Sequence, residues 1–186
     1  MIQHLIPISA LALVLLLSGC GAQTPMPGSQ EPEGATTVET TFTVDTPIQT
    51  VMDDPAFGDY GRLLFPTDDG YWSGETLGDL RLTFYSHIDP SETVEIVNTL
   101  KERALAGETI FYDIYTDEEK AADPDKEDTG LFFFKGEPGA RFAVCNAGGA
   151  FAYVGAMHDS FPHALELSKQ GYNAFALIYR PGAQTA

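Results

Sequence analysis

The sequence is poor in three things: positive charge, cysteine and long apolar runs. Ten Lys and Arg stand against 27 Asp and Glu among 186 residues, so the formal net charge is −17. That charge excludes nucleic acid as a partner, because its phosphates would be repelled. Two cysteines, Cys20 and Cys145, allow at most one disulfide. Apolar material is nevertheless ample for one folded core, with 44% hydrophobic residues, 12 Phe and 8 Tyr.

The most apolar run, residues 5–17, is shorter than the about 20 residues that a membrane span needs. Its length is typical of the apolar core of a secretory signal. It ends in Leu-Ser-Gly-Cys at residues 17–20, which resembles the lipobox of bacterial lipoproteins. The resemblance implies a signal peptide over 1–19, a lipid on Cys20 and a mature protein held at the cell membrane, outside the cytoplasm. One feature departs from the pattern of a signal, since no Lys or Arg precedes the apolar run. The alternative is a plain cleaved signal in which the cysteine is accidental.

The next segment is too polar to fold. Residues 20–41 are rich in Pro, Gly, Thr and Glu and contain almost no large apolar side chains. We expect a flexible linker there, followed by an amino-terminal extension over 42–106 and a second folded part over 107–186. If Cys20 carries lipid, Cys145 has no disulfide partner, and its place in an apolar strand predicts a buried, inert thiol.

Two helices and several strands are predicted. The first helix is capped by Asp89, with Glu92 completing a capping box, and is ended by Gly107. The second is capped by Ser160 and ended by Gly171. The charged segment 117–130 is expected to be a solvated loop rather than a metal site, because Asp128 replaces the glycine of an EF-hand loop. Strands are expected over 79–88, 109–116, 131–134, 141–147 and 172–179.

The last two strands show no polar alternation. We therefore expect them to be buried on both faces of a parallel sheet that is covered by helices, in an α/β fold. Two glycines follow the strand over 141–147 and precede a helix. Ligands of parallel sheets bind at the carboxyl ends of strands, so this turn is the best candidate for a site.

The segment NAGGAFAYVGAMHDSFPHALELSKQGYNAFALIYR resembles the early half of an α/β-hydrolase of the bacterial esterase and lipase group. That family has His-Gly-Gly-Gly or Pro-Gly-Gly-Gly after its third strand, and this chain has Ala147, Gly148, Gly149 and Ala150 there. The resemblance implies an oxyanion hole for carboxylic esters, with Gly149 and Ala150 as N–H donors and Gly148 shaping the turn. Ala150 fits this role if its φ is negative. The alternative is a turn that serves packing only.

The catalytic groups of that family are missing from the chain. None of Ser73, Ser160 and Ser168 lies in Gly-x-Ser-x-Gly. In the family the base follows the nucleophile, so His158 and His163 come too early, and His158 is expected at the mouth of a pocket. The resemblance thus implies an incomplete α/β-hydrolase sheet that needs no cofactor or metal.

A sheet truncated in this way has consequences for behaviour. The family's strand order is 1-2-4-3-5, so the strand over 142–147 becomes an exposed edge. We expect a poorly soluble chain, inactive on esters, whose substrate in a complete domain is a small ester such as an acetylated sugar. The alternative is a complete, non-catalytic surface lipoprotein that binds a ligand or partner through Tyr71, Trp72 and Phe84.

Overall fold

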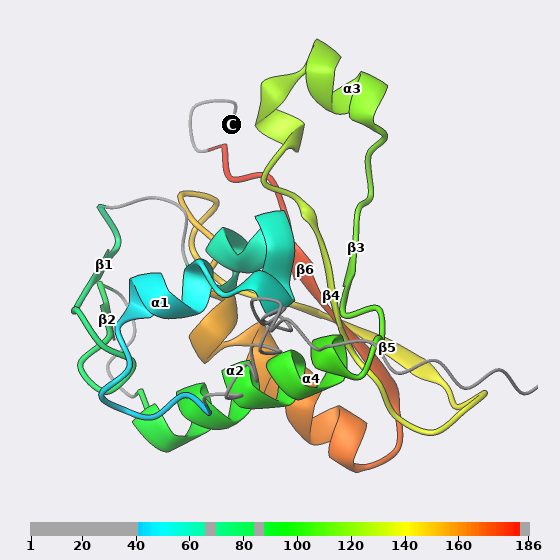
Figure 1. The fold of residues 1–186 in the computed structure, drawn as a ribbon. Coiled ribbons are helices and arrows are strands. Elements are labelled where there is room, and N and C mark those ends of the chain that lie inside the picture. The colour runs from blue at the N-terminus through cyan, green and yellow to red at the C-terminus, as the bar shows by residue number, and fades with distance from the viewer. Residues whose placement is uncertain (1–40, 66–69, 84–87, 183–186) are drawn as a thin grey trace, which may run out of the picture. The chain divides into compact units, whose positions relative to one another are not determined.

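A computed structural model describes residues 41–65, 70–83 and 88–182, which belong to the same structural unit. Figure 1 shows the arrangement of its helices and strands. Phe84 of the aromatic hypothesis, Cys20 and the predicted signal and linker lie outside the described residues.

A four-stranded mixed sheet forms the centre of this unit. Its strands are β3 (Phe111–Tyr112), β4 (Gly130–Phe134), β5 (Phe142–Asn146) and β6 (Asn173–Ile178), in the spatial order β3-β4-β6-β5. β4 is antiparallel to both of its neighbours, and only β5 and β6 are parallel. The parallel pairing predicted for the last two strands is therefore confirmed, while β4 makes the sheet as a whole mixed. Among the described residues β5 pairs with β6 alone, so it forms the predicted edge.

The two faces of the sheet differ. On β4 and β6 every second side chain is buried, Phe132, Phe134, Ala174, Ala176 and Ile178 among them. The side chains between them are only partly covered, and on β5 Phe142 is 73% and Val144 49% exposed. The prediction of burial on both faces is thus wrong. These strands are continuously apolar, but the described helices cover only one side.

Two helices form the covering layer, α2 (Pro90–Leu105) and α4 (Ser160–Lys169), which lie against each other beside the sheet (Figure 1). α2 begins as predicted, with the Asp89 carboxylate accepting from the Ser91 N–H, and no reciprocal bond from Glu92 accompanies it. It ends at Gly107, where φ is +77° and the N–H groups of residues 107 and 108 return to the carbonyls of residues 104 and 103.

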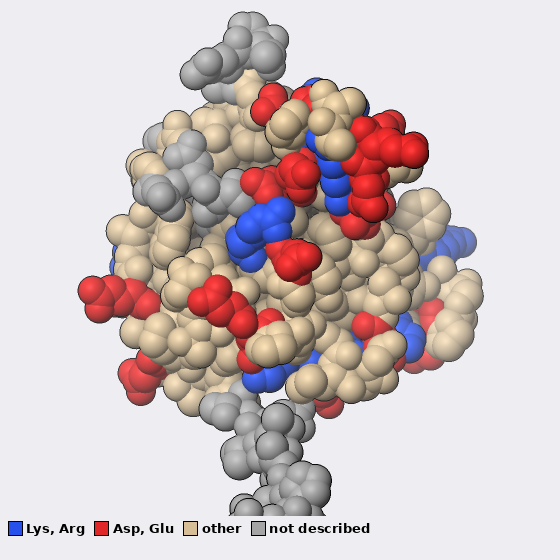
Figure 2. Space-filling view, turned by 45° about the horizontal axis from the view of Figure 1, so that its top comes forward, with Lys and Arg blue, Asp and Glu red and all other residues tan. Residues whose placement is uncertain are grey.

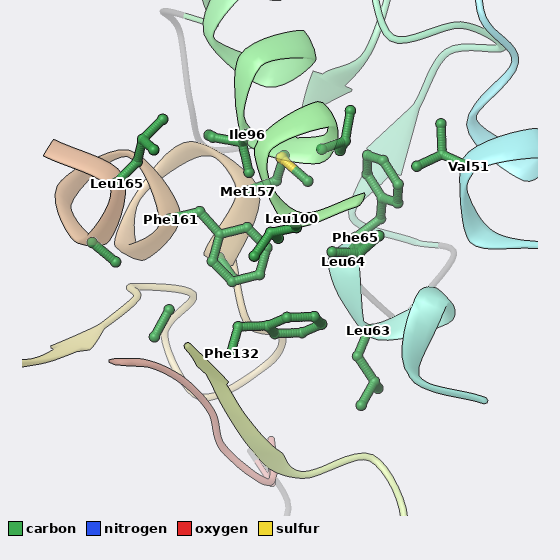
Figure 3. Packing of buried hydrophobic residues seen from close by; sticks show 14 of the residues in the cluster. Val51, Leu63, Leu64, Phe65, Ile96, Leu100, Phe132, Met157, Phe161 and Leu165 are labelled. Carbon is green, nitrogen blue, oxygen red and sulfur yellow. The ribbon is translucent and has the colours of Figure 1, made fainter. Parts of the chain in front are cut away.

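The core of the unit lies between this helical layer and the sheet. Phe132 of β4 points toward Phe161 of α4 and Leu100 of α2 (Figure 3), and its ring meets that of Phe161 edge to face at 5.0 Å. Residues on both sides of the predicted boundary at 106/107 contribute to this core. The earlier ones come from α1 (Ile48–Met52), the 3₁₀ helix η1 (Pro55–Leu64), α2 and the segments outside them, which supply Phe42, Phe65, Leu77 and Leu80.

The remaining elements are short. β1 (Trp72–Ser73) pairs with β2 (Arg81–Leu82). A strand was predicted over 79–88, and β2 is the part of that range in which the described residues form one, since 84–87 lie outside the description. The strand predicted over 109–116 is reduced to β3. The segment expected to be a charged loop contains α3 (Asp117–Ala122) and the 3₁₀ turn η2 (Pro124–Lys126). α3 has a reciprocal capping box between Thr116 and Glu119, a signal that the sequence carries and that the loop assignment missed.

Several of the few Lys and Arg side chains are paired with carboxylates. On the face seen in Figure 2, blue side chains lie beside red ones. The ion pairs of the described residues include the exposed pair Arg62–Asp128, with 2.7 Å between Nη2 and Oδ1, and the more enclosed pair Lys101–Asp54, with 2.8 Å between Nζ and Oδ2. Exposed pairs of this kind contribute about 0–1 kcal/mol, so they do not set the fold.

Candidate functional site

The glycine loop, residues 147–150, follows β5 at its carboxyl end, as expected. The chain then passes through the 3₁₀ turn η3 (Ala156–His158) into α4, so the glycine loop lies between a strand and a helix in the sequence. Gly149 has φ +149°, and a Cβ at this position would collide with the backbone oxygen of Tyr153. The N–H groups of Ala152 and Tyr153 both donate to the Gly149 carbonyl, at 2.9 and 3.3 Å. The chain folds back so tightly here that only glycine fits at position 149.

Asp159 holds the first part of the glycine loop. Its Oδ2 accepts a 2.7 Å hydrogen bond from the Gly148 N–H, and the Gly148 carbonyl accepts from the Gly155 N–H at 3.0 Å. Because the Gly148 N–H is occupied, Gly148 shapes the turn rather than donating to a ligand. Asp159 is also the N-cap of α4, where its side chain makes no capping bond. The cap predicted at Ser160 is wrong, since Ser160 is the first helical residue.

Tyr179 holds the same loop from the other side. It directly follows β6, and its hydroxyl lies 3.0 Å from the Ala147 carbonyl oxygen and 3.3 Å from that of Tyr153. Burial and the nearby Asp159 carboxylate raise the pKa of Tyr179, so the hydroxyl keeps its proton and donates. Sequence reasoning missed both Asp159 and Tyr179 as parts of the site. They lie 11 and 32 residues from the atoms they bind.

The two predicted donors, Gly149 and Ala150, are the part of the loop left without partners. Within the described residues neither N–H makes a hydrogen bond, and Ala150 is exposed. The condition set for Ala150 is not met, because its φ is +53°. Phe151 follows with φ +60° and its ring 69% exposed. Two consecutive non-glycine residues in the left-handed region are uncommon and indicate that the surrounding contacts impose this conformation.

His158 lies inside η3 rather than at an open mouth. Its Nε2 is enclosed and has no hydrogen-bond partner among the described residues. Burial lowers the pKa of His158 to about 4, so the ring is neutral at pH 7. The neighbouring Ser160 is 1% exposed, and its Oγ is likewise without a partner there. His163 is exposed, and its Nδ1 lies 2.6 Å from the Asp159 carbonyl oxygen.

Cys145 lies on β5, three residues before Gly148. It is half-buried against the core instead of fully buried, because the edge strand is covered on one side only. Burial, with a smaller contribution from the Asp159 carboxylate, raises the pKa of its thiol. The thiol is therefore protonated at neutral pH, in keeping with the predicted lack of reactivity.

Two aromatic residues of the alternative hypothesis, Tyr71 and Trp72, pack against other parts of the described chain. The Tyr71 ring stacks on that of the buried Tyr153 with centroids 4.8 Å apart, and Trp72 packs against the core. These contacts are the ordinary packing use of aromatic side chains.

One hollow of the described surface lies away from the glycine loop. A cavity of about 430 Å³ opens between η1, β3 and α3, and its charged lining includes Arg62, Asp113 and Lys120. Lys120 is ion-paired with Asp113 across it. No residue of the glycine loop lines this cavity, so it is separate from the predicted site.

Comparison with protein-family models, with curated proteins and with solved structures finds no match to this chain. Within the described residues no three His, Cys, Asp or Glu side chains are grouped as a metal site would require. None of the helices in the described part of the chain has the length and apolar character of a membrane span.

Proposed function

We propose that residues 107–186 are the amino-terminal part of an α/β-hydrolase domain that acts on carboxylic esters. The observation that carries the proposal is the strand order. With β3, β4, β5 and β6 taken as the first to fourth strands, the observed order is 1-2-4-3, which is the beginning of the order 1-2-4-3-5 of that family. The glycine loop then follows the third strand, at the position of the family's oxyanion loop.

The chemistry assigned to the loop is stabilisation of negative charge. In ester hydrolysis the carbonyl oxygen becomes an oxyanion in the tetrahedral intermediate. Backbone N–H groups fixed in advance around it lower the barrier, and one such donor is worth about 10²–10³ in rate. The Gly149 N–H group is the candidate, because it has no partner within the described chain, whereas the Gly148 N–H is bound to Asp159. The Ala150 N–H is also without a partner there, but the φ of +53° at Ala150 does not meet the condition set for it as a donor.

The chain supplies no nucleophile for that reaction, since no serine lies in Gly-x-Ser-x-Gly. We therefore expect the 186-residue chain to be inactive toward esters such as p-nitrophenyl acetate. Hydrolysis that a serine-directed fluorophosphonate blocks would contradict the missing nucleophile. The decisive experiment is to read the coding DNA beyond codon 186. An in-frame Gly-x-Ser-x-Gly within about a hundred codons supports the proposal, and a stop codon there together with a monomeric, well-protected chain contradicts it.

The activity of the continued chain tests the loop itself. Gly149→Ala should lower kcat on p-nitrophenyl acetate by 10²-fold or more, because the added methyl group displaces the donor. The matched control is Gly139→Ala, whose φ is also positive at +73° but whose Cβ would meet nothing within 4 Å. Equal activity of the two variants would show that the glycine loop serves packing only.

The same proposal includes attachment to the membrane through lipid on Cys20, with the folded part outside the cytoplasm. It is supported by the apolar run over 5–17 that ends in Leu-Ser-Gly-Cys. Cys20→Ala should release the protein from the membrane fraction or leave the signal uncleaved. A variant that stays in the membrane with its signal removed would contradict lipid attachment.

A further inference from the structure

Two side chains fix the glycine loop, one through a backbone N–H and the other through backbone carbonyls. The Asp159 carboxylate binds the N–H of Gly148, and the Tyr179 hydroxyl binds the carbonyl of Ala147, the residue before it. The loop is thus held on both sides of the peptide bond that joins residues 147 and 148. The next two N–H groups, those of Gly149 and Ala150, remain without partners in the described part of the chain.

We propose that Asp159 and Tyr179 are positioning residues that keep the Gly149 N–H group free and fixed for a ligand's oxyanion. The inference rests on the proposed function for the identity of that ligand. The structural part of the inference does not depend on the identity of the ligand. It states that the two side chains hold the glycine loop in a conformation that the loop would otherwise leave. Ala150 and Phe151 have φ of +53° and +60°, which L-residues seldom adopt without support from neighbouring contacts.

The two side chains that hold the glycine loop come from different elements, and this restricts the motion of the loop. Asp159 stands at the start of α4, and Tyr179 directly follows β6. A further contact joins the loop to the segment after β6, where the Gly182 N–H donates to the Phe151 carbonyl at 2.8 Å. The Phe151 ring also lies edge-on to the Tyr179 ring, with centroids 6.2 Å apart. Residues 147–151 are therefore clamped between the parallel strands and the helix that connects them.

The two supports differ in chemistry. The bond from the Gly148 N–H to Asp159 is charge-assisted and short, and it should weaken when the carboxylate takes up a proton. The bond from Tyr179 needs only a neutral hydroxyl. The ionisable groups that face Asp159 or share its electrostatic environment are His163 of α4, Tyr153 of the loop's return, Tyr179 after β6 and Cys145 of β5. Acid should therefore loosen the loop at its Asp159 support before it affects the Tyr179 support.

The experiment uses residue-resolved amide hydrogen exchange and NMR on the ¹⁵N-labelled chain, with no ester present. Asp159→Ala should speed exchange of the Gly148 amide at least tenfold, while the amides of β6 change less than twofold. Tyr179→Phe should speed exchange of the Tyr153 and Gly155 amides, which close the turn. The matched controls are Glu166→Ala, an exposed acid on the same helix, and Tyr172→Phe, an exposed tyrosine just before β6. Both controls should leave the loop amides unchanged.

A second readout separates positioning from general stability. In the unmodified chain the Gly148 amide shift should move as acid protonates Asp159. In Asp159→Asn the shift should be flat while exchange protection is largely restored, because the amide oxygen still accepts the bond. An unmodified chain whose Gly148 shift ignores acid would overturn the role of Asp159, even if every variant failed to fold. Unchanged loop exchange in folded Tyr179→Phe would overturn that of Tyr179.

These outcomes are independent of the hydrolase assignment. Absence of Gly-x-Ser-x-Gly downstream would remove the oxyanion as the ligand and leave the measured loop contacts intact. Loss of the loop contacts would leave the assignment based on strand order standing.

Discussion

The two faces of the sheet have nearly the same apolar composition and opposite environments. On the covered face Phe132 and Phe134 of β4 are fully buried, and the rings of both lie against that of Phe161 of α4. On the other face Phe133 stacks on Phe175 of β6 with ring centroids 4.7 Å apart, and Phe142 at the edge is largely exposed. Hydrophobicity alone therefore does not determine burial in this protein. A strand is buried only where another element supplies the opposing layer.

The exposed face carries a large group of apolar side chains. Tyr112, Phe133, Phe142, Val144 and Phe175 come from all four strands and share it. Monomeric proteins seldom leave such a continuous apolar patch open to water. Within the proposed function, the later part of a hydrolase domain is what would cover it.

The largest expected difference between the faces is in stability. Phe132→Ala removes a ring packed among the helices and should lower the free energy of unfolding by about 3–5 kcal/mol. Phe142→Ala removes an exposed ring and should change it by less than about 0.5 kcal/mol. Urea denaturation followed by circular dichroism measures both. Equal losses would show that the open face is covered in solution, for example by self-association.

The helical layer also encloses a titratable ring. The pKa of His158 is lowered by burial from 6.5 to about 4. Above pH 6.5 the ring is neutral in both states and its burial carries no proton cost. As pH falls from 6.5 to 4 the unfolded state binds a proton that the folded state does not, so stability drops by about 3 kcal/mol and then levels off.

Denaturation curves at several pH values, compared between variants, isolate this contribution. In His158→Gln the free energy of unfolding should no longer show the extra decrease between pH 6.5 and 4. In His163→Gln, which replaces an exposed ring, that decrease should remain. An identical pH dependence in His158→Gln and the unmodified chain would contradict the burial of a neutral imidazole.

A smaller effect tests how closely the covered face is packed. A Cβ at Gly130 of β4 would collide with the Phe111 ring, which stacks on Tyr60 at 4.7 Å and meets Phe132 edge to face at 5.0 Å. Since the ring is held on both sides, Gly130→Ala should cost about 1–3 kcal/mol in overpacking. A neutral result in thermal denaturation would mean that Phe111 can move away, and that the covered face is loose near β3.

The smallest expected change in stability occurs at the open edge, where association is the informative measurement. Val144→Lys places a charge on β5 and should reduce aggregation, because an edge charge opposes strand pairing with another chain. The free energy of unfolding should stay within about 0.5 kcal/mol. Light scattering and size exclusion compare the aggregation of Val144→Lys with that of Val44→Lys, which replaces a valine of similar exposure outside the sheet. If both variants aggregate as the unmodified chain does, the edge is not the surface that associates.

Local signals in the sequence predicted local structure well. Asp89, Gly107 and Gly171 mark helix ends as expected, and β4, β5 and β6 lie within a residue or two of their predicted ranges. The missed helix α3 was also locally encoded, in the Thr116 and Glu119 pair. The charge of that segment obscured this signal.

What the sequence did not predict depends on contacts between distant residues. Continuous apolarity cannot tell whether a second helical layer exists, so burial of the open face was predicted wrongly. The position of the glycine loop followed from its pattern, but the roles of Asp159 and Tyr179 depend on where α4 and β6 bring them. The positive φ of Ala150 likewise results from the closed turn around Gly149 and not from any preference of alanine.

The position of β6 affects how the protein is made. It is the last strand among the described residues, yet it lies between β4 and β5. Within the described residues β4 otherwise pairs only with β3, and β5 pairs with no other strand. While the chain emerges from the ribosome, the four-stranded sheet cannot form until residue 178 has been made. Until then β3 and β4 form a short pair, and β5 is unpaired. During that interval an apolar strand has both edges open, and chaperone binding or misassembly competes with folding. Synthesis rate over 147–172 is therefore expected to influence the yield of folded protein.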